Sequence, residues 1–250
     1  MIHNVNILCN FSAIGAPGNV IMINSTSNQT VMKGLCYLTS NITDTEIIPK
    51  ILHSAIGGIL LTFTVCSVCA NGLILYVILV QKGSFIDRIH LYIAVVCFLA
   101  LLMSVLGCPL VVSSSFAGRW LFGDGGCIYS GFVITFCGLS TILILAMISV
   151  DRFAMVVYDA FRGPSSRRFC ITGMSGCLIV SLILAILPLI GWNRYTYESI
   201  GTACALDIQN DDVMSRTYLM TLLVICFIIP LCTMVFCYWK LISKVNLYTM

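Results

Sequence analysis

Five stretches without a charged side chain limit how this chain can fold. No lysine, arginine, aspartate or glutamate occurs within residues 51–81, 89–118, 125–150, 169–193 or 217–239. Each stretch is longer than the roughly 20 residues that an α-helix needs to cross about 30 Å of hydrocarbon. Because backbone groups in lipid must be hydrogen-bonded within the segment, each stretch is expected to be helical. We therefore predict transmembrane helices at residues 52–80, 89–113, 125–151, 169–191 and 217–240.

The composition supports lipid as the solvent. Hydrophobic residues make up 59% of the 250, and charged residues only 9%, whereas a soluble domain carries roughly 25% charged residues. A single apolar segment could be a buried helix of a soluble protein, but five in succession argue against that. The alternating pattern of a membrane β-barrel is not seen. We predict an all-α membrane protein embedded in the lipid bilayer.

The polar segment before the first helix indicates the orientation. It contains four Asn-x-Ser/Thr triplets, which can be glycosylated only on the lumenal side. Their acceptors are Asn10, Asn24, Asn28 and Asn41. Lysine and arginine lie close to the opposite helix ends, as expected for the cytoplasmic side. We expect a multi-pass cell-membrane protein with an extracellular N-terminus, a cytoplasmic C-terminus and no cleaved signal peptide.

Two cysteines and one charged triplet mark the third helix. Cys127 begins this helix, and Cys204 lies in the loop between the fourth and fifth helices. Both are predicted on the oxidising side, so a disulfide is allowed, although two unrelated thiols remain an alternative. Asp151-Arg152-Phe153 ends the helix, and Arg152 follows Cys127 by one membrane crossing of helix. By itself, such a triplet is more often a solvated helix end.

Together these residues resemble the rhodopsin-like (class A) receptors, which join a cysteine at the top of helix three to Asp/Glu-Arg-Tyr at its base. The resemblance covers residues 51–245 and includes further short motifs: Asn71, Trp120-Leu121-Phe122-Gly123, Phe227-Ile228-Ile229-Pro230 and Phe236-Cys237-Tyr238. It implies five transmembrane helices of a seven-helix bundle and a Cys127–Cys204 disulfide. It also implies coupling to a heterotrimeric G protein. The residues with an activation role would be Asp151, Arg152, Phe153, Pro230 and Tyr238.

The loop from Gly191 resembles that of the opsins, Gly-Trp-x-x-Tyr-x-x-Glu followed by Cys-x-x-Asp, at the same spacing. This implies retinal as cofactor and Glu198 as counterion to its cationic Schiff base, since Ser130 stands where vertebrate visual opsins have an acid. A plain surface glutamate is the alternative. By resemblance, the retinal pocket would include Gly131, Thr135, Gly138 and Phe227. The two glycines could equally serve close helix packing.

The chain departs from the family in several places. Ala100 and Leu178 replace a helix-two acid and a helix-four tryptophan, and the lysine that carries retinal in opsin helix seven is not in the sequence. We expect residues 1–50 to be a glycosylated tail, 51–245 the receptor helices and 246–250 a cytoplasmic end. Helices six and seven are missing, and we expect the sequence to be a fragment of a longer receptor.

The resulting functional hypothesis is a light-activated receptor. One alternative is a rhodopsin-like receptor for a diffusible ligand. Another is a non-signalling truncated receptor that pairs with full-length chains. No metal cluster, nucleophile–base pair or phosphate-binding loop stands out in the sequence, so we expect neither an enzyme nor a metal site. We also expect no nucleic-acid partner.

Overall fold

The computed structural model describes residues 44–80, 88–157 and 164–249. The predicted glycosylation acceptors Asn10, Asn24, Asn28 and Asn41 lie outside these residues. The chain divides into two compact units, Met1–Leu52 and His53–Met250. In the described residues, the first unit contributes only the beginning of helix α3. All packing described below lies within the second unit.

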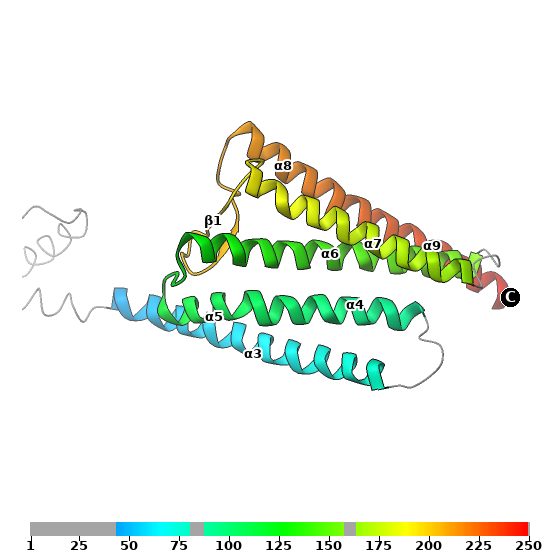
Figure 1. The fold of residues 1–250 in the computed structure, drawn as a ribbon, viewed down its shortest axis with the longest axis horizontal. Coiled ribbons are helices and arrows are strands. Elements are labelled where there is room, and N and C mark those ends of the chain that lie inside the picture. Colours follow the sequence, from blue (N-terminus) through cyan, green and yellow to red (C-terminus); the bar gives the residue numbers. More distant parts are fainter. Residues whose placement is uncertain (1–43, 81–87, 158–163, 250) are drawn as a thin grey trace, which may run out of the picture. The chain divides into compact units, whose positions relative to one another are not determined.

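The described residues contain five helical spans, at the places where five were predicted (Figure 1). The first is α3 (Asp44–Val80) and the third is α6 (Gly123–Val157). The second consists of α4 (Arg88–Leu102), the π-helical turn η1 (Met103–Gly107) and α5 (Cys108–Ala117). The fourth is α7 (Pro164–Ile186) followed by the 3₁₀ turn η3 (Leu187–Ile190), and the fifth is α8 (Val213–Leu223), η4 (Val224–Ile228) and α9 (Ile229–Thr249). The helices extend beyond most of the predicted limits because helical hydrogen bonding does not stop at the edge of the hydrocarbon.

Two prolines explain the two π-helical turns. Proline has no backbone N–H, and its ring collides with the carbonyl one turn earlier in the helix. Pro109 follows η1, and Pro230 follows η4. In each case the widened turn lies immediately before the proline, where it relieves this collision. The predicted distortion of the fifth helix at Pro230 is therefore present.

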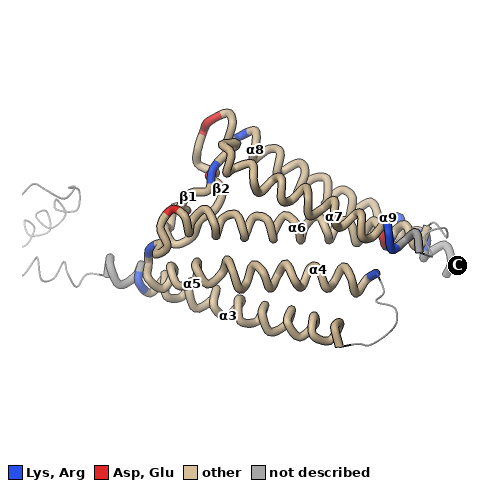
Figure 2. The backbone as a smooth tube through the Cα atoms, viewed as in Figure 1, with Lys and Arg blue, Asp and Glu red and all other residues tan. Residues whose placement is uncertain are grey.

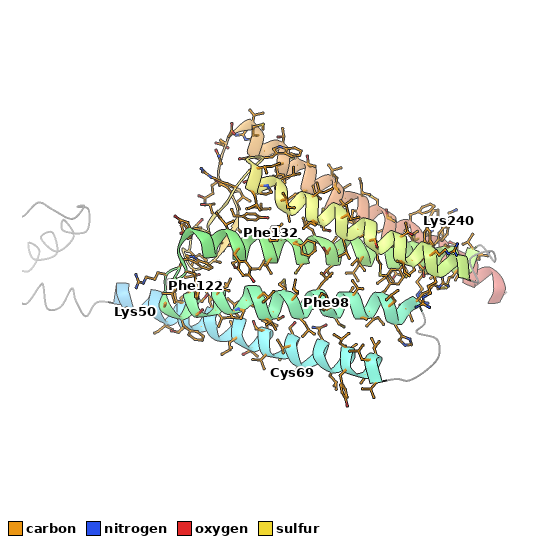
Figure 3. The ribbon with its side chains drawn as sticks, viewed as in Figure 1. Lys50, Cys69, Phe98, Phe122, Phe132 and Lys240 are labelled. Carbon is orange, nitrogen blue, oxygen red and sulfur yellow. A yellow bond between two sulfur atoms is a disulfide. The ribbon has the colours of Figure 1, made fainter. Side chains whose placement is uncertain are left out.

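Helix α6 is the centre of the packing, with contacts to α4, α7 and α9 (Figure 1). Its buried residues Val133, Cys137 and Ile144 recur at helical spacing and face one core cluster. Tyr92 and Leu99 of α4 and Cys170 and Met174 of α7 complete that cluster. Apolar burial thus joins the second, third and fourth spans. Figure 3 shows side chains filling the space between these helices.

Helix α3 is largely exposed, as expected for a helix that faces lipid. It packs closely against its neighbour at Gly57, where an added Cβ would lie 3.1 Å from the ring of Phe116. A polar contact lies further along the helix. The Ser104 hydroxyl donates to Ser67 Oγ at 2.8 Å, and Asn71 Nδ2 donates to the Ser67 carbonyl at 2.9 Å. Asn71, noted in the sequence, thus supports a link between the first two spans.

Candidate functional site

A short hairpin is tied to the beginning of α6. Strand β1 (Tyr195–Tyr197) pairs antiparallel with β2 (Cys204–Leu206), and Tyr197 lies opposite Cys204. A disulfide joins Cys204 to Cys127, whose Cα atoms are 5.2 Å apart. The predicted disulfide is therefore present. It holds the hairpin on the first turns of α6 and stops the loop from moving away from the helices.

Tyr195 lies directly on Gly131, one of the predicted pocket residues. A Cβ added at Gly131 would lie 2.6 Å from Tyr195 Cδ1, a distance that only a shift of the ring could relieve. The tyrosine hydroxyl donates to the carbonyl of Ala185 in α7 at 2.9 Å. Burial raises the pKa of Tyr195 to about 12, with the Thr135 hydroxyl acting in the opposite direction, so the side chain is a neutral donor at neutral pH. Gly131 thus serves close packing, as one alternative predicted, but the neighbour that packs against it is the hairpin rather than another helix.

Aromatic side chains fasten the loop to α7 and α8. Trp192 Nε1 donates to Thr217 Oγ1 at 3.0 Å. The rings of Trp192 and Tyr218 meet edge to face with centroids 5.7 Å apart, a favourable aromatic geometry. Tyr218 is fully buried and donates to the Leu184 carbonyl at 2.8 Å. The loop therefore has anchors on α6, α7 and α8.

A buried carboxylate organises the loop after β2. Asp207 Oδ2 accepts from Arg194 Nε at 2.9 Å, and Oδ1 accepts from the backbone N–H groups of Gln209 and Asn210 at 3.1 Å each. Burial alone would raise the pKa of Asp207. The hydrogen bonds and the positive charge of Arg194 outweigh burial and lower it. Asn193, with φ 85°, donates to the Asp207 carbonyl at 3.2 Å.

The predicted counterion lies in the hairpin turn. The Glu198 N–H donates to the Ala203 carbonyl at 3.0 Å, and its carbonyl accepts from the Gly201 N–H at 2.8 Å. Its side chain is exposed. Its carboxylate forms no hydrogen bond or salt bridge with any other residue that the structure describes. The neighbouring Tyr197 hydroxyl donates to Asp124 at the start of α6, and this bond raises the pKa of Tyr197.

The other predicted pocket residues are spread along the helices. Thr135 is half-buried and lies near Tyr195. Gly138 is open, since an added Cβ would have no neighbour within 4 Å. Phe227 lies in η4 with 59% of its surface exposed. The structure therefore brings Gly131 and Thr135 to the hairpin, while Gly138 and Phe227 lie on open helix faces.

At the opposite end of α6, Asp151 is buried and forms a salt bridge between helices. Arg88 Nη1, at the start of α4, lies 3.2 Å from Asp151 Oδ1. The adjacent Arg152 is half-buried and forms no ion pair within the described ranges. The charged partner of Asp151 is thus Arg88, and the triplet does more than end a helix in solvent.

Phe153 and the fifth span complete this end of the protein. The rings of Phe153 and Phe236 meet edge to face with centroids 6.0 Å apart. Lys244 Nζ donates to the Val157 carbonyl near the end of α6 at 3.3 Å. Tyr238 has 49% of its surface exposed. These contacts join α9 to α6 close to the Asp-Arg-Phe triplet.

Sequence reasoning missed two residues that organise these ends. Arg88 lies just before the predicted second span and was assigned no role, yet it forms an ion pair with the buried Asp151. Tyr195 was noted only as the tyrosine of the loop motif, yet its ring covers Gly131. The signal for Arg88 was available, since an arginine at the first turn of an apolar helix can reach an acid at the same end of its neighbour. Nothing in the local pattern indicated where the Tyr195 ring would lie.

The fold and this stapled loop define a multi-pass helical membrane protein. Comparison with known proteins gives its family. Residues 70–249 match the family described as 7 transmembrane receptor (rhodopsin family). The chain belongs to this family, whose members are signalling receptors rather than enzymes.

Individual relatives are opsins. The chain is 26% identical over 194 residues to a rhodopsin of Sphodromantis sp., covering 78% of the chain and 51% of the relative. It is 28% identical over 197 residues to the visual pigment-like receptor peropsin of Mus musculus, covering 78% and 58%. The crystal structure of squid rhodopsin matches with a TM-score of 0.73 and 25% identity, covering 79% of this chain and 57% of that one. The chain thus spans between about half and three fifths of these proteins.

Proposed function

We propose that the chain contributes the first five helices of an opsin-type photoreceptor that binds retinal beneath the β1–β2 hairpin and activates a heterotrimeric G protein. The observation that carries the proposal is the stapled hairpin, with Tyr195 seated on Gly131 under the Cys127–Cys204 disulfide. The similarity of the chain to a rhodopsin and to a peropsin supports the same assignment. The hairpin end would be extracellular and the Arg88–Asp151 end cytoplasmic.

The residues present fit one wall of a retinal site. Gly138 leaves open space beside α6, and the half-buried Thr135 lies one turn below Gly131. Such small residues suit the apolar polyene of retinal, which supplies light-driven isomerisation when it is bound. The lysines of the described spans, Lys50, Lys240 and Lys244, lie at or near the ends of those spans. The attachment point would therefore belong to a part of the receptor outside these 250 residues.

The chain's own residues would close and polarise this site. Tyr195, held by its hydrogen bond to the Ala185 carbonyl, would cover one side of the site. Glu198 carries a carboxylate without an ion pair among the described residues, so its charge is available to a cation. A carboxylate about 4 Å from a cation stabilises it by roughly 4 kcal/mol at an effective dielectric constant of 20. A carboxylate so placed would favour the protonated form of a cationic group bound at this site.

At the other end, activation would open the contacts that hold α6 to its neighbours. The ion pair between Asp151 and Arg88 would open, and Arg152 would be free to contact the G protein. Tyr238 and Phe153 would follow movement of α9, with the distortion before Pro230 as a pivot. Such a change is a shift between two packings of one helical bundle.

The test uses the receptor expressed from the complete transcript. Reconstitution with 11-cis retinal should give an absorption band in the visible range, and Glu198→Gln should shift this band or lower the pKa of the Schiff base. Asp211→Asn, in the same outer segment, is the matched control and should leave both unchanged. Absence of a visible band would refute the photoreceptor proposal and favour a receptor for a diffusible ligand. An unchanged spectrum and pKa in Glu198→Gln would remove Glu198 from the counterion role.

A further inference from the structure

A fully buried tyrosine near the end of the protein opposite the disulfide has a hydroxyl group without a partner. Tyr92 lies in α4, and none of its surface is exposed. Its hydroxyl has no partner at hydrogen-bonding geometry among the residues that the structure describes. The Cys170 thiol lies beside it, but a thiol is a weak hydrogen-bonding partner. Burying a hydroxyl that makes no hydrogen bond is costly, so the position of this group calls for a physical reason.

Tyr92 is buried by helices that belong to this chain. Its core cluster includes Ile144 of α6 and Cys170 of α7, and Met147 and Ile148 of α6 pack against that cluster. Because no part of Tyr92 is exposed, a residue from elsewhere in the receptor could not reach the hydroxyl without displacing these neighbours. A partner for the hydroxyl is therefore to be sought among the groups that already surround it.

A buried charge lies close to this hydroxyl. Charged side chains of the described spans gather at the span ends (Figure 2), and at this end Arg88 Nη1 lies 3.2 Å from Asp151 Oδ1. Arg88 and Tyr92 are four residues apart, so they share one face of α4. Side chains of an α-helix lean toward its N-terminus, and α4 begins at Arg88. The Tyr92 ring is therefore directed toward the ion pair, and the charges of both Asp151 and Arg88 act on its hydroxyl.

The Asp151 carboxylate can accept more than one hydrogen bond. Its side chain is 4% exposed, and an ionised carboxylate offers about four acceptor sites. If Arg88 moves away, a buried negative charge is left without its cation, which is strongly destabilising. A neutral hydroxyl within reach would offset part of this cost, since a hydrogen bond to a charged group is stronger than one between neutral groups.

We propose that Tyr92 is a second, latent partner of Asp151, whose hydroxyl donates to the carboxylate when Arg88 withdraws from it. Asp151 then stays bound to α4 in both arrangements, first through an ion pair and then through a neutral donor. These contacts require neither retinal nor a G protein. Their consequence for activation rests on the proposed function: the Arg88–Asp151 pair could open without leaving a buried charge unpartnered.

The experiment compares the effect of one hydroxyl group in two backgrounds. The receptor expressed from the complete transcript is unfolded reversibly by sodium dodecyl sulfate in mixed micelles, and circular dichroism gives its folding equilibrium constant. In the parent, Tyr92→Phe should change this constant by no more than about two-fold, because it removes a hydroxyl without a partner. In Arg88→Met, which has no donor at this position, Tyr92→Phe should lower the constant about ten-fold or more, because a hydrogen bond to a charged group is lost.

Two controls separate this effect from a general loss of packing. Tyr218 is also fully buried, but its hydroxyl donates to the Leu184 carbonyl, so Tyr218→Phe should lower the constant equally in both backgrounds. Adding Asp151→Leu to Arg88→Met should make Tyr92→Phe silent again, because the acceptor is then gone. The assay involves no chromophore and no G protein, so its result does not depend on whether the photoreceptor proposal holds.

The proposal is rejected if Tyr92→Phe has the same effect in the parent and in Arg88→Met, or if its cost in Arg88→Met persists after Asp151→Leu is added. If Arg88→Met does not fold, Arg88→Gln takes its place. The neutral amide of glutamine leaves acceptor sites of the carboxylate free, so Tyr92→Phe must still lower the constant at least about three-fold more than in the parent. A smaller difference rejects the second partner.

Discussion

The buried ion pair between Arg88 and Asp151 can be tested by charge removal. Its atoms are 3.2 Å apart, and the side chains are 19% and 4% exposed. At this separation two unit charges attract by about 5 kcal/mol with an effective dielectric constant of 20. Much of this attraction is offset by the desolvation of both groups. Replacing one partner alone leaves a buried charge unpaired, which costs roughly 3–5 kcal/mol in other proteins.

We therefore predict that Arg88→Gln destabilises the folded chain by about 2–3 kcal/mol, below that range because Arg88 is partly exposed and water can reach the vacated space. Asp151→Asn, which removes the buried charge itself, should cost less. The double variant should be more stable than the sum of the two effects predicts, with a coupling energy of about 2 kcal/mol. The assay is reversible unfolding by sodium dodecyl sulfate in mixed micelles, followed by circular dichroism.

The chain offers an internal control for this cycle. Arg216 and Asp211 form a shorter ion pair, at 2.6 Å, but their side chains are 60% and 91% exposed. Exposed pairs contribute roughly 0–1 kcal/mol. The cycle of Arg216→Gln and Asp211→Asn should therefore give a coupling below about 0.5 kcal/mol. If the Arg88–Asp151 coupling were as small as that of the exposed pair, the argument that burial strengthens the salt bridge would be refuted.

Three further predictions concern the hairpin. Gly131→Ala should cost about 1–3 kcal/mol in the same assay, because the new Cβ collides with the Tyr195 ring, and Tyr195→Ala should abolish that penalty. Cys127→Ser should cost about 4 kcal/mol, because the disulfide closes a long loop with a sequence separation of 77, and reducing agent should then have no further effect. Protease resistance of the loop should persist as the pH falls below the ordinary aspartate pKa of about 3.9 and be lost at still lower pH, since the depressed pKa of Asp207 makes its carboxylate stabilising only while it is ionised. Asp207→Asn should lack this acid transition.

The number of spans could be predicted because charge is costly in hydrocarbon and leaves gaps that can be counted. The ends of the helices could not, since backbone hydrogen bonds continue into water: α6 ends at Val157, beyond the predicted residue 151. The hairpin was also beyond prediction. Its strands have three residues each, too few for an alternating pattern to be recognised.

The candidate site also has one part that could be predicted from the sequence and one part that could not. The disulfide could be anticipated because membrane topology alone places Cys127 and Cys204 on one side, and the family resemblance then indicated that they pair. The partner of Asp151 could not, because a contact between helices depends on how each helix is rotated about its axis. A sequence shows which residues of one helix share a face. How α4 is rotated relative to α6 is set by the packing of the whole core.

The π-helical turn before Pro109 has a consequence for comparing helix two with its relatives. Such a turn holds one residue more than an α-helical turn, so residues on its two sides are out of phase by about 100° relative to a regular helix. Ala100 was matched to the family's helix-two acid by counting back from Pro109, and this count crosses the π-helical turn. If a relative has a regular helix there, the matching residue is one position away from Ala100. The neighbours, Leu99 and Leu101, are also apolar. Whichever register a relative adopts, helix two of this chain has no acid at the centre of the bundle.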